Sequence, residues 1–493
     1  MSTRSEGVVP IAASTVPRAV GRRVSALLEE NGTLVVTLAA FAALLLVHSP
    51  FSLVQDGWMA LVSGREVAHG LPSHDTLTIW AHGRRWIDQQ WLAQLGLYEL
   101  FRLGGIRLVM LVHAAFATAG LAGAAVLARR LGASARSTTW TCLLAVFAFW
   151  GEGAVMRTQS LAYAFFVAVL WLLLEDRARP SRRVYAVLPL IAVWANLHGS
   201  VVLGTALVAG YALLDVLASL RARRPLPGAR PVVLVIGSGL CVFASPYALS
   251  LPAYYGKVLF TGGFGTYISE WAPTTLSLHN FSTFAVALGG FWLLGRAGGI
   301  ASAFEKLAFV GLTLLAFAAL RNGVWLALFA LAVLPRLLDQ LRRPAFEPRR
   351  VNRLLAVAAV ALLGAVTVSV AAKPASWFTQ GYPVSVARAA VASAGPHGRI
   401  YADERYADWL LFQAPQLRGR LAFDTRFELL TPGQLASIDG VRAGAGDWRG
   451  TLRGYPTLVL VPGHDVAPLA AFMGARGTST LLATGSVVVI RRG

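Results

Sequence analysis

The chain has 493 residues, of which 56% are hydrophobic and only 14% are charged. Soluble domains carry about 25% charged residues, so this composition excludes an ordinary soluble protein and predicts a polytopic membrane protein. The net charge of +20 does not indicate nucleic-acid binding, because the arginines stand in short clusters between apolar runs, a pattern that sets membrane orientation. The two cysteines, Cys142 and Cys241, lie in apolar runs and indicate neither a disulfide framework nor a metal site.

The N-terminal segment, residues 1–32, is polar and contains Pro10, Pro17 and several Ser and Thr residues. We expect it to be a disordered cytoplasmic tail. Residues 33–373 then contain a series of apolar runs, and a membrane span needs about 20 such residues. Eleven spans are predicted, of which the third and fifth are short: 33–51, 106–128, 137–150, 158–174, 184–195, 200–219, 231–245, 283–295, 304–320, 323–338 and 354–372.

Basic residues follow the second, fourth, sixth and tenth spans, and Arg296 and Lys306 separate the eighth from the ninth. Every second connection is therefore basic. Basic connections stay in the cytoplasm, which places the N-terminus inside, the C-terminus outside, and the large loops 52–105 and 246–282 at the outer face. The predicted fold class is a polytopic α-helical membrane protein with about eleven transmembrane helices.

The segment after the last span, residues 374–493, differs in composition, with Gly and Pro punctuation and ordinary charge. Short apolar runs alternate there with stretches of helical pattern. That alternation predicts a small C-terminal α/β domain, which the predicted topology makes extracytoplasmic. The predicted strands lie at 399–403, 420–424, 457–462 and 486–492, and the helices around 404–412, 432–440 and 466–475.

Two aspartates in the loop 52–105 are candidate catalytic acids. Asp56 directly follows the first span, where a helix would hold its carboxylate at the membrane surface. A helix N-cap accounts for its position equally well. Asp75 lies in the turn LPSHDTLT and is either a second acid or the acceptor of a cap or Asx turn.

Asn196 and His198 interrupt an otherwise continuous apolar run in the motif WANLHG. Non-helical backbone at the membrane edge is tolerated where it is buried in protein or lines a cavity. A histidine there can donate to a phosphate or move a proton near neutral pH, whereas the alternative is a tight turn with a solvated imidazole. The abrupt break, which includes Gly199, favours a functional role.

Three further charged residues belong to the predicted outer loops. Arg157 either binds an anion or pairs with Glu152. Arg321 lies between two apolar spans with almost no loop around it, where a cation is costly unless it is paired or bound to an anion. Phosphate is a natural partner, since a guanidinium donates in a bidentate manner. Glu270 lies in the motif ISEWAP of the loop 246–282. The gathering of polar groups at one face indicates a site at the outer membrane–water boundary.

The C-terminal segment has its own charged motifs, YADERYADWL and FDTRFEL, with Asp403, Asp408, Asp424 and Arg426. These residues either face the membrane site or serve as caps and salt bridges within the domain. The second alternative is favoured, because strand ends and helix starts in small α/β domains commonly need such groups.

Several motifs together resemble a known family. The segment DGWMALVSGREVAHGLPSHDTLTIWAHGRRWIDQQWL contains D-x-W, G-x-P-x-x-D and W-x-x-x-x-WL elements, and WANLHG, ISEW and FDTRFEL follow later. With the many spans and the C-terminal domain, they resemble the GT-C glycosyltransferases, which include the protein O-mannosyltransferases and the aminoarabinose transferase group. The predicted topology resembles that of the family over most of the chain. The sequence resembles it only in the motifs given above. In one departure, Gly57 follows Asp56, where protein mannosyltransferases have an adjacent Asp-Glu pair.

GT-C enzymes transfer a sugar from a polyprenyl-phosphate carrier to an acceptor at the outer membrane face. The resemblance therefore implies a sugar-lipid donor, membrane lipid contacts, and a glycan, lipid or protein acceptor; no nucleic-acid partner is expected. It implies that Asp56 is the base and Asp75 a second acid. The implied substrate and phosphate contacts are Arg157, Asn196, His198, Glu270 and Arg321. Carboxylates near Asp56 and Asp75 would suit Mg²⁺ or Mn²⁺, but no ligand set is visible and no cofactor is predicted with certainty.

Three functions are therefore compared. The first is an inverting GT-C glycosyltransferase of a bacterial cell envelope in the cytoplasmic membrane. The second is a transporter or flippase of lipid-linked glycans, which predicts polar residues at mid-depth and repeated broken helices. The third is a non-catalytic envelope assembly protein that uses the C-terminal domain to bind partners. The polar groups gather at one face, which favours the enzyme.

Overall fold

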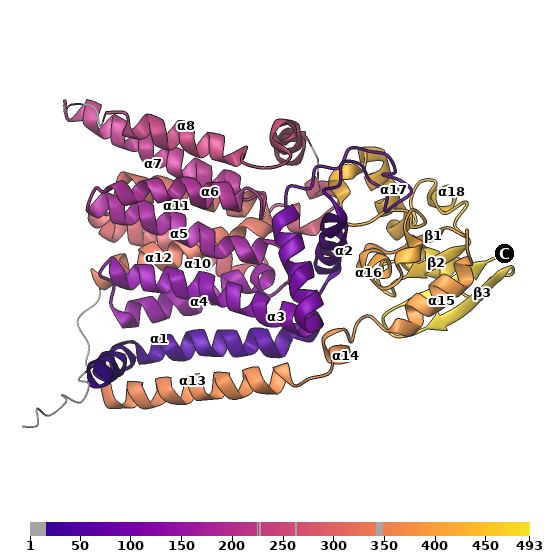
Figure 1. The fold of residues 1–493 in the computed structure, drawn as a ribbon, viewed down its shortest axis with the longest axis horizontal. Helices are drawn as coiled ribbons and strands as arrows, with labels where there is room; N and C mark the ends of the chain where they lie inside the picture. The colour runs from indigo at the N-terminus through magenta and orange to yellow at the C-terminus, as the bar shows by residue number, and fades with distance from the viewer. Residues whose placement is uncertain (1–15, 224, 226–227, 262–263, 342–348) are drawn as a thin grey trace, which may run out of the picture.

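The computed structural model describes residues 16–223, 225, 228–261, 264–341 and 349–493. A bundle of roughly aligned helices forms one part of the molecule, and a smaller α/β domain covers one end of the bundle (Figure 1). The loop that joins the first two bundle helices lies between these two parts and contacts both.

Each predicted span coincides with a helix of the described chain. The bundle helices are α1 (Val16–Ser52), α3 (Trp91–Arg130), α4 (Ala135–Gly153), α5 (Gln159–Ala178), α6 (Val187–Trp194), α7 (Val201–Arg221), α8 (Arg230–Val242), α10 (Phe281–Ala297), α11 (Ala303–Ala318), α12 (Gly323–Asp339) and α13 (Arg349–Ala371). Six of the described helices are long and apolar enough to cross a membrane, namely α1, α3, α7, α10, α12 and α13. The eleven-span count itself stays a prediction.

The core of the bundle is centred on α12. Every residue from Gly323 to Pro335 is buried, so this helix is apolar on all sides because other helices surround it on all sides. In contrast, α13 leaves most of its aliphatic side chains exposed and packs mainly along α1 at the edge of the bundle. An exposed apolar face of this kind suits contact with lipid.

Two boundaries differ from the predicted ones. Helix α1 begins at Val16, so residues 16–32 are helical instead of forming part of a disordered tail, and residues 1–15 lie outside the described residues. Helix α3 begins at Trp91, inside the predicted loop 52–105, and contains a kink at Gly104 and Gly105. Gly105 has a φ of 65°, a conformation that favours glycine.

The two ends of the bundle differ in chemistry. At the end remote from the α/β domain, arginines pair with residues 29–31 of α1, where this helix has a kink: Arg129 donates to Asn31 and Glu30, and Arg353 pairs with Glu29 at 2.9 Å. The other end carries the long connections and the α/β domain (Figure 1). This separation agrees with the alternation of basic connections along the chain.

The α/β domain contains a four-stranded sheet within the described residues, with the order β1-β2-β4-β3. Strands β1 and β2 are parallel, with Ile400 opposite Thr457, while β4 is antiparallel to both of its neighbours. The elements are α14 (Ala375–Phe378), α15 (Val384–Ala394), β1 (Ile400–Ala402), α16 (Glu404–Gln413), α17 (Pro432–Ala443), α18 (Trp448–Thr451), β2 (Thr457–Leu460), α19 (Val466–Phe472), β3 (Thr478–Ala483) and β4 (Val488–Arg492).

One predicted strand is replaced by a different arrangement. Residues 420–424 do not form a strand of the sheet but lie extended between β1 and the first long loop, with Leu421 bridged to both Ile400 and Thr78. The Ile79 and Trp80 N–H groups donate to this segment at 2.8 and 2.9 Å. The loop therefore supplies the hydrogen bonds that a neighbouring strand would otherwise provide. The strand β3 was not predicted.

Helix α2 (Gln55–His69) fixes the loop between bundle and domain. A side chain at Gly64 would collide with the Gln94 carbonyl at 2.2 Å, so this glycine permits α2 to lie directly on α3. On its other side, Arg65 donates to the Leu411 carbonyl of α16 at 2.9 Å, and Trp58 packs against Phe412. The start of α2 is thereby held in place from both sides.

Candidate functional site

An ion-pair network joins Asp56 to three loops that are distant in the sequence. Arg157 lies at its centre, with Nε 2.9 Å from Asp56 Oδ2 and Nη1 2.8 Å from Glu152 Oε2. Arg157 Nη2 pairs with Glu270, whose other oxygen lies 3.3 Å from Arg321. The structure thus brings together four of the predicted site residues, and Glu152 joins them as the partner that the sequence offered as the alternative.

The network contains three carboxylates and two guanidinium groups, so it has an excess of negative charge when all five are ionised. Arg321 has the weakest hold within it, because a single contact at 3.3 Å ties it to Glu270 and its guanidinium lies over the Trp271 ring at 4.7 Å. Arg157, with three acidic partners, is anchored much more firmly. Arg321 is consequently the cation that can turn to another anion at least cost.

Gly57 explains how Asp56 reaches Arg157. A Cβ atom at Gly57 would lie 2.9 Å from Leu53 and 3.1 Å from the Met156 carbonyl oxygen. The Met156 N–H in turn donates to Ser52 at 2.8 Å. The absence of a side chain at this position lets the start of α2 lie against residue 156. A side chain here, as in the Asp-Glu pair of protein mannosyltransferases, would crowd the Met156 carbonyl and displace the Leu53 side chain.

Capping does not account for Asp56. The N-cap position of α2 belongs to Val54, and Asp56 lies in the first turn, with no side-chain cap hydrogen bond among the described residues. One third of its side chain is exposed. Burial raises the pKa of Asp56, Arg157 opposes this increase, and the charges of Glu270 and Glu404 add to it. A carboxylate with a raised pKa and an exposed face is a better proton acceptor than an ordinary surface aspartate.

His198 lies in the break between α6 and α7, as the sequence predicted. Its Nδ1 accepts from the Ser200 N–H at 3.1 Å, which leaves the proton of the neutral ring on Nε2. Burial, followed by the charges of Arg321 and Arg157, lowers the pKa of His198 to about 3. The imidazole is therefore neutral at physiological pH and can donate one hydrogen bond close to the two arginines.

Asn196 holds this break together. Its Oδ1 accepts from Trp91 Nε1 at 2.7 Å, and its amide donates to the carbonyls of Ala192 and Ala244. All of these contacts are internal to the protein. Asn196 therefore positions the loop of His198 against the start of α3.

Asp75 lies in a second, separate network. Its side chain is fully buried and accepts from the backbone N–H groups of Leu77 and Thr78, both at 3.2 Å, and from Arg426. Arg426 also pairs with Asp424 and lies 4.2 Å from the centre of the Trp86 ring. Burial alone would raise the pKa of Asp75, but Arg426 and the two N–H donors lower it overall. These contacts match the turn alternative for Asp75.

The α/β domain contributes acids that sequence reasoning did not assign to the site. Glu404 begins α16 and pairs with Arg442, and its charge acts on Asp56. Asp408, four residues later and fully buried, accepts from Thr425 at 2.8 Å. Burial raises the pKa of Asp408 well above its usual value, and Asp424 and Asp56 add to this increase. Asp408 stands in the motif YADERYADWL, for which the sequence favoured a cap or salt bridge within the domain over a position facing the membrane site.

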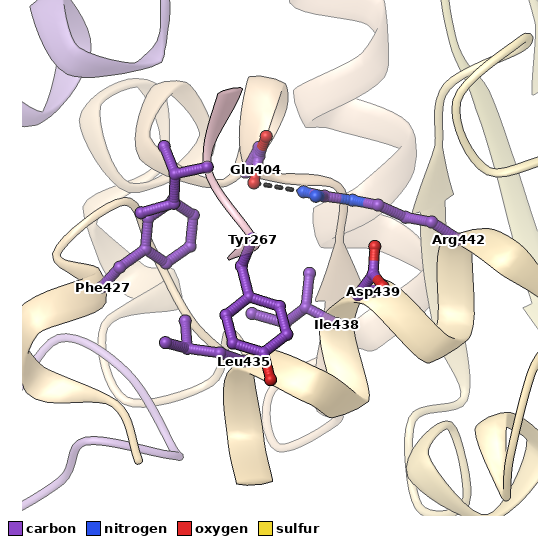
Figure 2. A pocket seen from close by; sticks show the side chains of 8 residues that line it. Tyr267, Glu404, Phe427, Leu435, Ile438, Asp439 and Arg442 are labelled. Atoms are coloured by element: carbon purple, nitrogen blue, oxygen red, sulfur yellow. Dashed lines mark hydrogen bonds and ion pairs between the residues drawn. The ribbon is translucent and has the colours of Figure 1, made fainter. Parts of the chain in front are cut away.

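A small pocket lies beside this cluster, between the loop 246–282 and the α/β domain (Figure 2). Tyr267 of the loop lies over Leu435 and Ile438 of α17, while the Glu404–Arg442 pair forms the polar wall. Asp56 does not line this pocket. The pocket is a small gap between the loop 246–282 and the α/β domain, and the ion-pair network does not line it.

A divalent cation shared by Asp56 and Asp75 does not fit this geometry. Both oxygens of Asp75 are already occupied by hydrogen-bond donors. Among the described residues, the group with metal-ligand spacing is Asp403, His464 and Asp465, whose ligand atoms all lie within 4.8 Å of one another. Asp403 there caps α16 and contacts His464. The described residues around Asp56 therefore do not form a group with metal-ligand spacing.

The described residues thus form a bundle of helices, a first long loop that contains α2, and a C-terminal domain that covers the loop end of the bundle. No protein-family model and no curated protein sequence matches the chain. Several solved structures do match, and two of them cover most of this chain. The chain is a multi-pass membrane protein that shares the fold of these two structures.

The first of these is the crystal structure of ArnT from Cupriavidus metallidurans in the apo state. It matches with a TM-score of 0.52 and 17% identity, over 96% of this chain and 98% of that chain. The second is the oligosaccharyltransferase of Archaeoglobus fulgidus in the apo form, with a TM-score of 0.50 and 11% identity, over 87% of this chain and 69% of that chain. Identities this low establish the shared fold alone.

Proposed function

We propose that this chain is an integral membrane glycosyltransferase that moves a sugar from a polyprenyl-phosphate carrier to a cell-envelope acceptor. The fold supports this proposal, because the chain spans nearly the full length of ArnT. A further match is the Archaeoglobus fulgidus oligosaccharyltransferase AglB in complex with an inhibitory peptide and a dolichol-phosphate, with a TM-score of 0.50. A polyprenyl phosphate is thus a ligand that this fold can accept.

The observation that carries the proposal is the ion-pair network of Asp56, Arg157, Glu270 and Arg321. Sugar transfer from a phosphate carrier requires a base beside the acceptor and positive charge beside the leaving phosphate. Asp56 offers a partly exposed carboxylate, and Arg321 offers a guanidinium with one weak contact. The two residues are connected through Arg157 and Glu270, so one site can serve both ends of the reaction.

In the proposed reaction, the hydroxyl oxygen of the acceptor attacks the anomeric carbon of the sugar. Asp56 accepts the proton that this hydroxyl group loses. The bond between that carbon and the carrier phosphate breaks, and the electron pair stays on the phosphate. Arg321 and the Nε2–H of His198 stabilise the charge that develops there. Arg157 orients Asp56 through their 2.9 Å contact and Glu270 orients Arg321, so both are positioning residues.

Asp75 takes a different role in this proposal. Its oxygens are filled by Arg426 and by backbone donors, and its side chain is fully buried. We therefore assign it to the joint between the first long loop and the α/β domain instead of to the acid–base chemistry.

The proposed location is the cytoplasmic membrane of a bacterium, with the α/β domain outside. The end of the bundle that carries the arginine pairs with α1 would face the cytoplasm under the positive-inside rule. The donor head group and the acceptor would then meet at the outer face, beside α2. Protease accessibility of the α/β domain in spheroplasts measures this placement.

The test is sugar transfer in membranes that contain the full-length chain, with radiolabelled polyprenyl-phosphate sugars as donors. The wild type should transfer label, and Asp56→Asn should not, at equal protein level. Asp447→Asn is the matched control, because Asp447 caps the exposed helix α18 and asparagine can keep that cap. If the wild type transfers from none of the donors, the transporter and assembly alternatives take precedence.

A further inference from the structure

A tight turn of the first long loop, residues 87–91, carries polar groups that the proposed reaction does not use. Asp88 is 3% exposed and Gln89 is 1% exposed. Asp88 Oδ2 and Gln89 Oε1 are buried and have no hydrogen-bond partner among the described residues. The Gln89 Nε2 group donates to the Ala195 carbonyl at 2.7 Å, which fixes the opposite end of the amide as the oxygen. Gln89 Oε1 is therefore a true unsatisfied acceptor, whereas burial raises the pKa of Asp88 to about 7, so that its carboxyl group can accept or donate near neutral pH.

Two other loops complete the surroundings of these acceptors. A Cβ atom at Gly199, next to His198, would lie 3.4 Å from Gln89 Oε1 and 3.8 Å from the ring of Tyr255. Tyr255 belongs to α9 (Leu251–Gly256), and its buried hydroxyl also lacks a partner. Gly199 thus leaves a space between Gln89 and Tyr255 that any side chain would fill.

This space adjoins the ion-pair network. Beside Tyr255, the Tyr254 ring lies 5.4 Å away at 73°. Burial raises the pKa of Tyr254, the charge of Asp88 adds to this increase, and Arg321 opposes it. Tyr254 therefore lies within electrostatic reach of both Asp88 and Arg321. The turn 87–91, Gly199 and α9 therefore meet at one place, and Gly199 directly follows His198 of the proposed phosphate contact.

The chemistry of this space selects its occupant. Buried acceptors without donors destabilise a protein, so a ligand that brings donors is favoured there. A carboxylate and an amide oxygen repel a phosphate and accept hydrogen bonds from hydroxyl groups. A sugar ring presents several hydroxyls, and its C–H face packs on aromatic rings such as those of Tyr254 and Tyr255.

We propose that Asp88, Gln89 and Tyr255 form a subsite that binds hydroxyl groups of the carried sugar, beside the phosphate contact at Arg321. The inference rests on the proposed function, since it assumes a sugar-bearing lipid as donor. The subsite determines which sugar is accepted, and Gly199 keeps it open.

The experiment compares two lipid probes on the purified full-length chain in nanodiscs: decaprenyl phosphate without a sugar, and decaprenyl phosphate carrying glucose, mannose or arabinose. The variants are Tyr255→Phe, which removes one hydroxyl, and Gly199→Ala, which fills the space without backbone strain, since Gly199 does not have a positive φ. Each should bind the preferred sugar-lipid about tenfold more weakly, the effect of one lost hydrogen bond, and bind decaprenyl phosphate as the wild type does. Tyr185→Phe, in the 3-10 turn Arg182–Ala186, is the matched control.

The outcomes separate the two proposals. If the wild type binds neither lipid, both the proposed function and the subsite are wrong. If the wild type prefers a sugar-lipid over decaprenyl phosphate and both variants keep that preference, the function stands and the subsite lies elsewhere. If the wild type binds both lipids equally and the variants change nothing, the unsatisfied groups hold ordered water only, and the subsite is overturned.

Discussion

The first long loop carries two arginine–carboxylate networks with opposite character. Around Asp56, three carboxylates surround two arginines, and a third of the Asp56 side chain is exposed. Around Asp75, Arg426 lies between two aspartates, and all three side chains are at least 94% buried. Both networks have one more carboxylate than guanidinium groups, but the first is partly open to solvent, whereas the second is closed and both oxygens of Asp75 accept hydrogen bonds.

The electrostatics of the two aspartates follow from this difference. Burial raises the pKa of Asp56, and Arg157 only partly offsets the increase. Burial also acts to raise the pKa of Asp75, but Arg426 and the backbone donors outweigh this effect and lower the pKa overall. Both aspartates lie beside an arginine, so proximity to an arginine does not distinguish them. The difference is that both oxygens of Asp75 already accept hydrogen bonds, which leaves Asp56 as the group available for proton transfer.

The largest effect is expected at the open network. Asp56→Asn should lower the transfer rate by about 10²–10⁴-fold, the usual contribution of a general base. The fold should persist, because an amide still fits the first turn of α2. Transfer per folded molecule and thermal unfolding in detergent check both parts. Asp75→Asn should keep most of the transfer rate per folded molecule. A loss as large as that of Asp56→Asn would contradict the assignment of the proton transfer to the Asp56 network.

The closed network should show its effect in stability. Arg426→Ala leaves Asp75 and Asp424 buried without their shared cation, which costs about 3–5 kcal/mol when a buried pair is broken. We expect a lower unfolding temperature and easier proteolysis between the loop and the α/β domain. Arg453→Ala, at an exposed position, is the matched control. Equal stability of the two variants would contradict a structural role for Arg426.

A smaller effect is expected for the weakly held arginine. Arg321→Lys keeps the charge but loses the forked donor geometry toward the leaving phosphate, so kcat/KM for the sugar-lipid should fall about tenfold, with most of the loss in kcat. Glu270 keeps its contact with Arg157, so stability should change little. Arg296→Lys, in the last turn of α10, is the matched control. An unchanged kcat/KM would exclude Arg321 from the donor site.

Much of this fold is readable from the sequence, because run length and periodicity are local. The spans, the α/β domain and helices such as α16 follow from such patterns. The partners of Asp56 do not, since Arg157, Glu270 and Arg321 lie 101 to 265 positions away. Only tertiary packing brings them together. Asp56 and Asp75 also occupy similar polar contexts in one loop, so their different roles depend on burial that the sequence does not display.

Two other differences have local physical causes. The segment 420–424 alternates like a strand, but its edge is taken by Ile79 and Trp80 of the first loop, which lies far away in the sequence. Strand β3 is largely exposed, so it lacks the apolar alternation by which buried strands are recognised. Gly57 was noticed as a departure from the family motif, and its reason, the contact with the Met156 carbonyl, is visible only in three dimensions.

The smallest predicted effect separates the two aspartates by the sign of a pH dependence. Because the folded-state pKa of Asp75 is lowered, the stability that it contributes is present above its ordinary pKa of about 3.9. That contribution is lost as the pH falls through the lower folded-state pKa. For Asp56 the folded-state pKa is raised, so its contribution is present at low pH and is lost as the pH rises through the folded-state value. The unfolding temperature of the wild type minus that of Asp75→Asn should therefore increase with pH across the acid range, while the same difference for Asp56→Asn should decrease. Two slopes of the same sign would show that the two networks hold their carboxylates alike, and the distinction between an open and a closed network would not stand.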